Sequence, residues 1–243
     1  MVNRNALRKG LVYMKRFFAV TLVLVLCLGV LPIAMAEVET ISFRGIEWGT
    51  PATELESKLS EVKLYSWDDV DSPKSVANFL FDGDDIYYDG EVNCRNYARP
   101  SSLKDLKVAG YAVEELYVYC AYVPGADGLL TGDLKDTAFI EAYYELDTKD
   151  PDLAYDDLLD KLTGLYGEVF YSNTRSPYIS YTYNVWKAAD DSMVCLEKRI
   201  YPSSGTDIYV KYAAGNADEL MSSAYKALVL QETKDAASNT DGL

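Results

Sequence analysis

The strongest constraint on the fold is a set of segments in which apolar and polar residues alternate. In residues 138–146, every second residue from Ala138 to Leu146 is apolar, and Glu141 and Glu145 lie between them. A period of two is typical of a strand with one covered face. Less regular apolar runs bounded by turn residues predict further strands at residues 76–81, 86–94, 113–123, 181–187, 193–201 and 208–212.

Three segments carry the signals of a helix start. Thr50-Pro51 and Asp150-Pro151 each place a capping side chain before a proline at the first helical position, and Gly167 ends the second helix. Asn216 with Glu219 forms a capping box for a third helix. Leucines and other apolar residues follow each start at helical spacing.

The order of these elements favours an α+β fold over a parallel sheet, because consecutive strands follow one another without helices between them. We expect an antiparallel β-sheet packed on one face by helices. Residues 37–230 would form this domain, built from two tandem, diverged helix-plus-meander units at residues 41–147 and 148–230. Residues 231–243 lose both periodicities and are predicted to form a flexible C-terminal tail.

The first 36 residues have the parts of a secretory signal peptide. Five basic and no acidic residues flank an apolar run from Phe17 to Leu31, and small residues precede a cleavage point before Glu37. The protein is therefore predicted to be secreted or to lie on the extracellular face of the cell envelope, with translation starting at Met1 or Met14. The alternative is an uncleaved membrane anchor, because residues 17–36 are long enough to cross a bilayer.

Charge and the lack of histidine exclude several classes of function. The chain has 38 acidic, 23 basic and no histidine residues, and removal of residues 1–36 leaves a net charge of −20. Such a surface opposes binding to nucleic acid and favours cationic partners, or serves only to keep an exported protein soluble. Without histidine, Ser-His and Cys-His nucleophile pairs cannot form, so we do not expect an enzyme.

Tyrosine is unusually frequent, with 21 tyrosines against seven phenylalanines and three tryptophans. A tyrosine joins a rigid apolar ring to a hydroxyl group, which suits surfaces that bind proteins or sugars. Trp186 alternates with Thr182 and Asn184, which predicts a contact role on a polar face. The alternative is that these rings simply pack half-buried strands. The predicted strands place the following tyrosines on a water-facing aromatic surface: Tyr117, Tyr119, Tyr143, Tyr183 and Tyr209.

One acidic cluster has the composition of a weak calcium site. Carboxylate oxygens are the ligands that Ca²⁺ takes, although the spacing here does not follow the EF-hand pattern. No other cofactor is predicted. The cluster consists of Asp82, Asp84, Asp85, Asp89 and Glu91.

Three cysteines follow residue 36: Cys94, Cys120 and Cys195. Export permits disulfides, and an odd number leaves one thiol without an intrachain partner. Cys94 and Cys120 are the predicted pair, because both lie in strand-like segments close enough to be hairpin neighbours. The alternative is that all three are buried thiols.

The segment Phe43–Pro51, with the sequence FRGIEWGTP, runs directly into the first predicted helix. It resembles the opening of the β-lactamase-inhibitor-protein-like and BamE-like domains, which are small exported bacterial units with a helix packed on an antiparallel meander. The paired cysteines of those units are missing here. The resemblance implies a binding or assembly scaffold, and it assigns no functional residue.

These observations predict an exported, non-catalytic protein that binds a protein or peptide at the cell surface or in the medium. The competing hypothesis is a carbohydrate-binding module or a histidine-free glycoside hydrolase. Two carboxylates suffice to hydrolyse a glycoside, and aromatic residues suit a sugar substrate.

Overall fold

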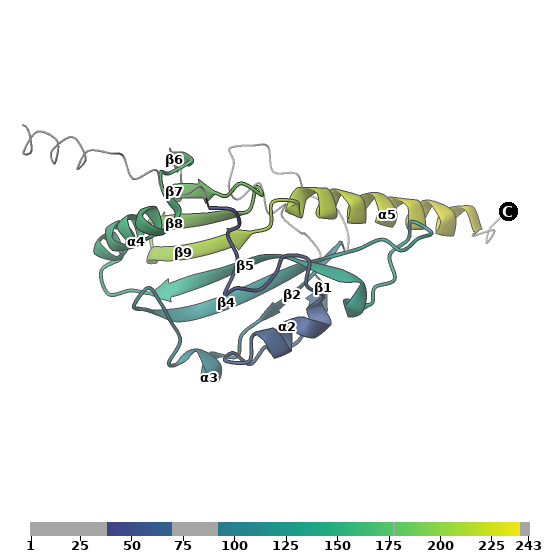
Figure 1. Ribbon diagram of the computed structural model, residues 1–243, viewed down its shortest axis with the longest axis horizontal. Coiled ribbons are helices and arrows are strands. Elements are labelled where there is room, and N and C mark those ends of the chain that lie inside the picture. Colours follow the sequence, from purple (N-terminus) through teal and green to yellow (C-terminus); the bar gives the residue numbers. More distant parts are fainter. Residues whose placement is uncertain (1–37, 70–91, 177, 239–243) are drawn as a thin grey trace, which may run out of the picture. The chain divides into compact units, whose positions relative to one another are not determined.

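The computed structural model describes residues 38–69, 92–176 and 178–238, whose strands form one antiparallel sheet (Figure 1). Along the sheet the order is β1-β2-β4-β5-β9-β8-β7-β6, and β3 pairs with β4. The strands are β1 (Asp68–Asp69), β2 (Asn93–Tyr97), β3 (Lys107–Val108), β4 (Tyr111–Tyr122), β5 (Thr137–Asp147), β6 (Tyr171–Arg175), β7 (Ser180–Lys187), β8 (Met193–Tyr201) and β9 (Gly205–Ala213).

The predicted α+β class, with helices packed on an antiparallel sheet, is confirmed. The three predicted helices are α2 (Ala52–Lys58), α4 (Pro151–Tyr166) and α5 (Ala217–Ser238). A short helix α3 (Pro100–Leu103), a 3₁₀ turn η2 (Leu134–Asp136) and strand β6 were not predicted. The predicted strand at residues 76–81 and most of the one at 86–94 lie outside the described residues.

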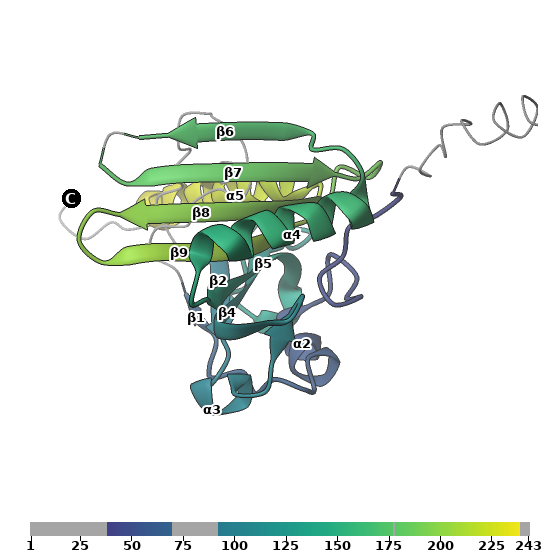
Figure 2. The same cartoon turned by 90° about the vertical axis from the view of Figure 1, so that its left-hand side faces the viewer.

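Helices lie on both faces of the sheet, whereas the sequence predicted one covered face. In Figure 2, α4 lies in front of β7–β9 and α5 lies behind them. On one face, which we call the α4 face, Trp186 packs in one cluster with Leu158 of α4. On the other, the α5 face, the neighbouring residues Val185 and Cys195 pack with Met221 of α5.

The α5 face is covered as well because the central strands carry apolar residues at consecutive positions, which point to both faces of the sheet. The run Met193–Leu196 in β8 is apolar on both faces, so each face of that strand has to be removed from water. Helix α5 can approach closely because Ala217, Met221 and Ala224 form a stripe of mostly small buried residues at helical spacing.

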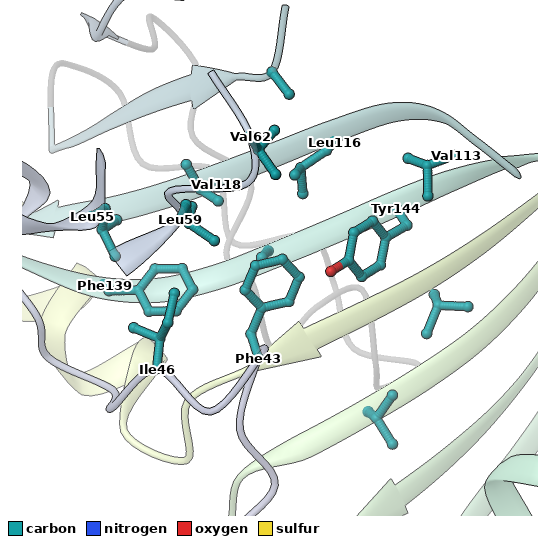
Figure 3. Close-up of a cluster of buried hydrophobic side chains, with 14 of the residues drawn as sticks. Phe43, Ile46, Leu55, Leu59, Val62, Val113, Leu116, Val118, Phe139 and Tyr144 are labelled. Atoms are coloured by element: carbon teal, nitrogen blue, oxygen red, sulfur yellow. The ribbon is translucent and has the colours of Figure 1, made fainter. Parts of the chain in front are cut away.

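The FRGIEWGTP segment forms a tight turn that places two side chains in the core. Arg44 and Gly45 both have positive φ, 54° and 72°, and the N–H of Ile46 donates to the carbonyl oxygen of Phe43 at 2.9 Å. Positive φ at both central positions is typical of hairpin turns, and glycine adopts it without strain. Phe43 and Ile46 consequently lie side by side against Phe139 of β5 (Figure 3).

The ends of α4 match the sequence prediction. The side chain of Asp150 accepts a hydrogen bond from the N–H of Leu153 at 3.1 Å, which satisfies one of the free donors of the first turn. At the other end, Gly167 has a φ of 88° and its N–H donates to the carbonyl oxygen of Thr163 at 3.0 Å.

The predicted cap of α2 is wrong. The hydroxyl of Thr50 donates to the carbonyl oxygen of Glu47 at 2.7 Å, and Pro51 occupies the cap position. The N–H of Ala52 donates instead to the hydroxyl oxygen of Thr137 at 2.9 Å. A residue 85 positions away therefore supplies the cap, which no local pattern can reveal.

The two predicted units share one sheet, because β5 of the first pairs with β9 of the second. The described residues lie within one compact unit, Glu37–Leu243. A register shift in the β4–β5 pairing leaves Ile140 without a cross-strand partner. Phe139 therefore packs on the α4 face and Ile140 on the α5 face, which interrupts the alternation that the sequence predicted.

The predicted flexible tail begins too early. Helix α5 continues to Ser238, so the folded part extends beyond residue 230. Residues 231–237 are mainly exposed and include glutamine, glutamate, lysine and alanine, which favour helix without an apolar stripe. Amphipathic periodicity was therefore the wrong criterion for this end of the helix.

Candidate functional site

A row of tyrosines crosses four neighbouring strands on the α5 face. In the strand register, Tyr97 of β2 lies opposite Tyr117 of β4, and Tyr117 lies opposite Tyr143 of β5. Tyr209 of β9 is a diagonal neighbour of Tyr143. Tyr65 joins the row at its other end, because its N–H donates to the carbonyl oxygen of Tyr97 at 2.9 Å. We call these five residues the tyrosine ladder.

The rings of the tyrosine ladder contact one another in sequence. Their centroids are 5.1 Å apart between Tyr65 and Tyr97, and 5.9 Å apart between Tyr97 and Tyr117. The next centroid distances are 5.0 Å from Tyr117 to Tyr143 and 6.1 Å from Tyr143 to Tyr209. The 5.0 and 5.1 Å pairs are stacked, and the last pair is edge-to-face. All these distances lie in the favourable range for aromatic pairs.

An arginine covers each end of the tyrosine ladder. The guanidinium carbon of Arg99 lies 5.4 Å from the ring centroid of Tyr65, and that of Arg199 lies 4.4 Å from the centroid of Tyr209. A guanidinium stacks favourably on an aromatic face. Each ring of the ladder therefore has an aromatic or cationic neighbour, and all of the rings except Tyr209 keep part of their surface exposed.

Exposure decreases along the tyrosine ladder. Tyr65 is 55% exposed, Tyr97, Tyr117 and Tyr143 are half-buried, and Tyr209 is only 7% exposed. Burial raises the pKa of the Tyr143 and Tyr209 hydroxyls above the ordinary tyrosine value. These hydroxyls stay protonated at neutral pH, so each can donate and accept hydrogen bonds.

A buried charge cluster lies beside the ladder on the same face. Glu197 of β8 forms ion pairs with Lys211 of β9 and with Arg199. Burial would raise the pKa of Glu197, but the charges of Lys211 and Arg199 hold it below its usual value.

Glu141 of β5 is the exception in this charge cluster. It is 3% exposed, and its side chain forms no ion pair or hydrogen bond to another described residue. Burial raises its pKa to about 8, against the opposing charge of Lys211 and with a further increase from Glu197. Glu141 is therefore mainly protonated at pH 7.

Three carboxylates gather at the Tyr209 end of the ladder. Glu115 of β4 lies opposite Glu145 of β5, and Asp207 of β9 accepts a hydrogen bond of 3.4 Å from the hydroxyl of Tyr209. Burial, together with the charges of Glu115 and Asp207, raises the pKa of Glu145 to about 7. Within the described ranges, none of the three forms an ion pair, so the group favours a basic side chain from outside.

The predicted tyrosines lie on one face, as the sequence indicated. Tyr119 stands beside Tyr143 with its centroid 6.2 Å away, and Tyr183 lies further along the same face, opposite Glu197. Tyr183 and Tyr209 are nevertheless only 6% and 7% exposed. The prediction that these two rings face water is wrong, because Arg199 covers Tyr209, and Tyr171 and Asn173 contact Tyr183.

The predicted contact role of Trp186 is wrong. Trp186 lies on the α4 face, is fully buried, and donates from Nε1 to the carbonyl oxygen of Gly167 at 3.2 Å. Its alternation with polar residues was misleading, because Asn184 is also buried and donates to the hydroxyl of Tyr155 on α4 at 2.8 Å. Asn184 thus bonds to a helix and does not mark a water-facing side of the strand.

Sequence reasoning missed Tyr65, Tyr97 and the charge cluster. The predicted strand ended at Cys94, although Arg95 and Tyr97 continue its period of two and offered a usable signal. The ion pairs of Glu197 with Lys211 and Arg199 depend on the pairing of β8 with β9, and the sequence carries no mark of which oppositely charged residues meet.

The structure bears on the other predicted sites in part. Cys94 and Cys120 are direct cross-strand partners, and both they and Cys195 are thiols.

The predicted calcium cluster at residues 82–91 lies outside the described residues, as does the signal peptide. Within residues 38–69, 92–176 and 178–238, no group of three metal-ligating side chains converges, and no helix is long and apolar enough to span a bilayer.

Comparisons of the chain with protein-family models, with curated proteins and with solved structures find no match. The resemblance of residues 43–51 to the β-lactamase-inhibitor-protein-like and BamE-like domains therefore remains a prediction.

Proposed function

We propose that this chain is an exported binding protein that holds an extended, basic segment of another protein against the tyrosine ladder. The observation that carries the proposal is the stacking of the ladder. Its rings pack against one another, and all of them except Tyr209 keep part of their surface exposed. Carboxylates without ion pairs to described residues lie next to them.

The stacked geometry favours a peptide over a sugar. Sugar platforms commonly use an aromatic ring whose flat face lies open to the ligand. Here Tyr117 has Tyr97 on one side at 5.9 Å and Tyr143 on the other at 5.0 Å. A peptide can instead use the ring edges and hydroxyls, because it carries backbone donors and acceptors along its whole length.

Charge favours a basic partner. Glu115, Glu145 and Asp207 stand together at one end of the ladder, and the chain after residue 36 has a net charge of −20. Lysine or arginine side chains of a bound segment would compensate the mutual repulsion of these carboxylates. Such complementarity raises the rate of association and depends on ionic strength.

The test uses a panel of ten-residue peptides that differ only in their charged residues, which are lysine and arginine, glutamate, or none. We expect the basic peptides to bind most tightly, and about 0.5 M salt to weaken that binding. A variant with Tyr65, Tyr97 and Tyr117 changed to phenylalanine keeps the rings and removes three hydroxyls. Its affinity for the basic peptides should fall by at least about tenfold.

Tyr178→Phe is the matched control, because Tyr178 is 84% exposed and takes no part in the ladder. Its affinity should equal that of the wild type. If none of the peptides binds, the proposed function is wrong. If the triple variant binds as tightly as the wild type, peptide binding occurs elsewhere on the molecule.

Carbohydrate hydrolysis is a second candidate, favoured by the pair Glu145 and Glu115. A carboxyl with a pKa of about 7 next to a second acidic side chain is the combination that glycoside hydrolases use. The test incubates the wild type and Glu145→Gln with a panel of polysaccharides and measures the reducing sugar released. Release by the wild type but not by Glu145→Gln would support hydrolysis in place of peptide binding. Sugar binding without release would indicate a carbohydrate-binding module.

A further inference from the structure

The three described cysteines differ in what surrounds them. Cys94 of β2 and Cys120 of β4 are directly opposite one another in an antiparallel pair and lie on the α4 face in the same buried cluster. Cys195 of β8 lies on the α5 face in the other cluster. The chain has a fourth cysteine, Cys27, in the predicted signal peptide.

The pattern of backbone hydrogen bonds between β2 and β4 sets the distance between the Cα atoms of Cys94 and Cys120. The N–H of Tyr122 donates to the carbonyl oxygen of Val92 at 3.0 Å, and that of Ala98 donates to the oxygen of Leu116 at 2.9 Å. Hydrogen-bonded pairs recur at every second residue, so Cys94 and Cys120 form such a pair, with a Cα separation of about 5.5 Å. Disulfides span Cα separations of about 4.4 to 6.8 Å.

Cys195 is excluded from either pairing by distance and by direction. Strands β5 and β9 lie between β4 and β8, which puts Cys195 about 14 Å from Cys120 across the sheet. Its side chain also points to the opposite face. The fold thus reduces the three possible pairings to one.

We infer that Cys94 and Cys120 form a disulfide that joins β2 to β4 when the protein folds in an oxidising compartment. In this step two thiols lose two protons and two electrons and gain one S–S bond. A disulfide donor such as oxidised glutathione accepts the electrons through two successive thiol–disulfide exchanges and leaves as two thiols. Cys195 stays a thiol.

The disulfide would act on the same strand pair that carries the tyrosine ladder. Tyr97 and Tyr117 are opposite one another three residues along β2 and β4 from the cysteine pair. A slip of one residue between these strands would move every side chain of β2 to the other face. The covalent link would therefore hold the register that sets Tyr97 against Tyr117. This inference does not depend on the proposed function.

Burial also indicates when the bond forms. Burial strongly raises the pKa of the Cys120 thiol, and both Cys94 and Cys120 are buried, so an external disulfide has little access to either sulfur in the folded protein. Oxidation should occur while the chain folds and should be slow once the sheet has closed.

The test refolds the full-length reduced chain in a glutathione buffer poised to oxidise thiols. The denatured product is then alkylated, digested with trypsin and analysed by mass spectrometry. The sequence places Cys94, Cys120 and Cys195 in separate tryptic peptides, residues 75–95, 108–135 and 188–198. We expect the first two peptides to be linked and lighter by two hydrogens, and the third to be alkylated.

A link that involves residues 188–198, or full alkylation of all three peptides after refolding, would overturn the inference. Thermal melting with and without reductant gives an independent readout. Reductant should lower the melting temperature of the wild type and of Cys195→Ala. Reductant should leave the melting temperatures of Cys94→Ser and Cys120→Ser unchanged. A decrease of equal size in all four proteins would also overturn the inference.

Discussion

Replacing Glu141 by glutamine is expected to stabilise the protein at neutral pH and to leave its stability near pH 4 unchanged. Glu141 is 3% exposed beside Lys211 and Glu197, and burial raises its pKa from 4.5 to about 8. At pH 7 the folded protein therefore holds a proton on Glu141 that the unfolded chain has released. Glutamine has nearly the same shape and is always neutral.

The sign and size of the effect follow from these two pKa values. A carboxyl whose pKa is higher in the folded than in the unfolded state stabilises the folded protein by binding a proton. For Glu141 this stabilisation is complete below pH 4.5, the unfolded pKa, and is lost as the pH rises towards 8. Between pH 4.5 and pH 7 the loss amounts to about 3 kcal/mol, at 1.36 kcal/mol per pKa unit. Glutamine does not titrate, so Glu141→Gln should be about 3 kcal/mol more stable than the wild type at pH 7.

Urea unfolding followed by tryptophan fluorescence measures this difference, because Trp186 is fully buried and reports on unfolding. The free energy of unfolding is measured at pH 4, 5.5, 7 and 8.5 for both proteins. Glu168→Gln is the control, since Glu168 is exposed, and it should stay within about 0.5 kcal/mol of the wild type throughout. A difference between Glu141→Gln and wild type that is equal at pH 4 and pH 8.5 would refute the reasoning.

Three further substitutions test the fold by the same unfolding assay. Asp150→Ala removes the hydrogen bond to the first turn of α4 and should cost about 1 kcal/mol, whereas no loss would mean that water replaces the cap. Gly215→Ala would place a Cβ 2.2 Å from the carbonyl oxygen of Asp190, which belongs to the backbone and cannot rotate away. It should cost at least about 1 to 3 kcal/mol, and wild-type stability would show that this loop yields easily. Leu158→Ala leaves a cavity under α4 and should cost about 2 to 5 kcal/mol, and a loss below 1 kcal/mol would mean that α4 is loosely packed.

Local patterns predicted the elements whose causes are local. Helix α4 begins after Asp150 and ends at Gly167 because a carboxylate cap and a glycine with positive φ act within a few residues of the helix. Strand β8 was predicted with its observed bounds from its apolar residues. Strand β6 was missed because it is polar and owes its conformation to pairing with β7.

The sequence predictions that were wrong at the candidate site concern residues whose burial depends on distant parts of the chain. Trp186 and Tyr183 stand on the same strand, and the sequence placed both as contact residues. The arrival of α4 on one face buries Trp186, and Arg199 with other neighbours covers the opposite face around Tyr209. Which side of a strand meets a helix depends on the path of the whole chain, so the pattern of one strand cannot decide it.

The sequence by itself determined the α+β class, the three longer helices and the presence of tyrosines on a common face of several strands. Those properties depend on capping residues and on side-chain alternation, which act over a few residues. Only the tertiary structure decided that β5 pairs with β9 and β2 with β4. These pairings bring Tyr143 to Tyr209 and Cys94 to Cys120, because contacts between distant residues depend on strand order and register, which one strand's sequence does not encode.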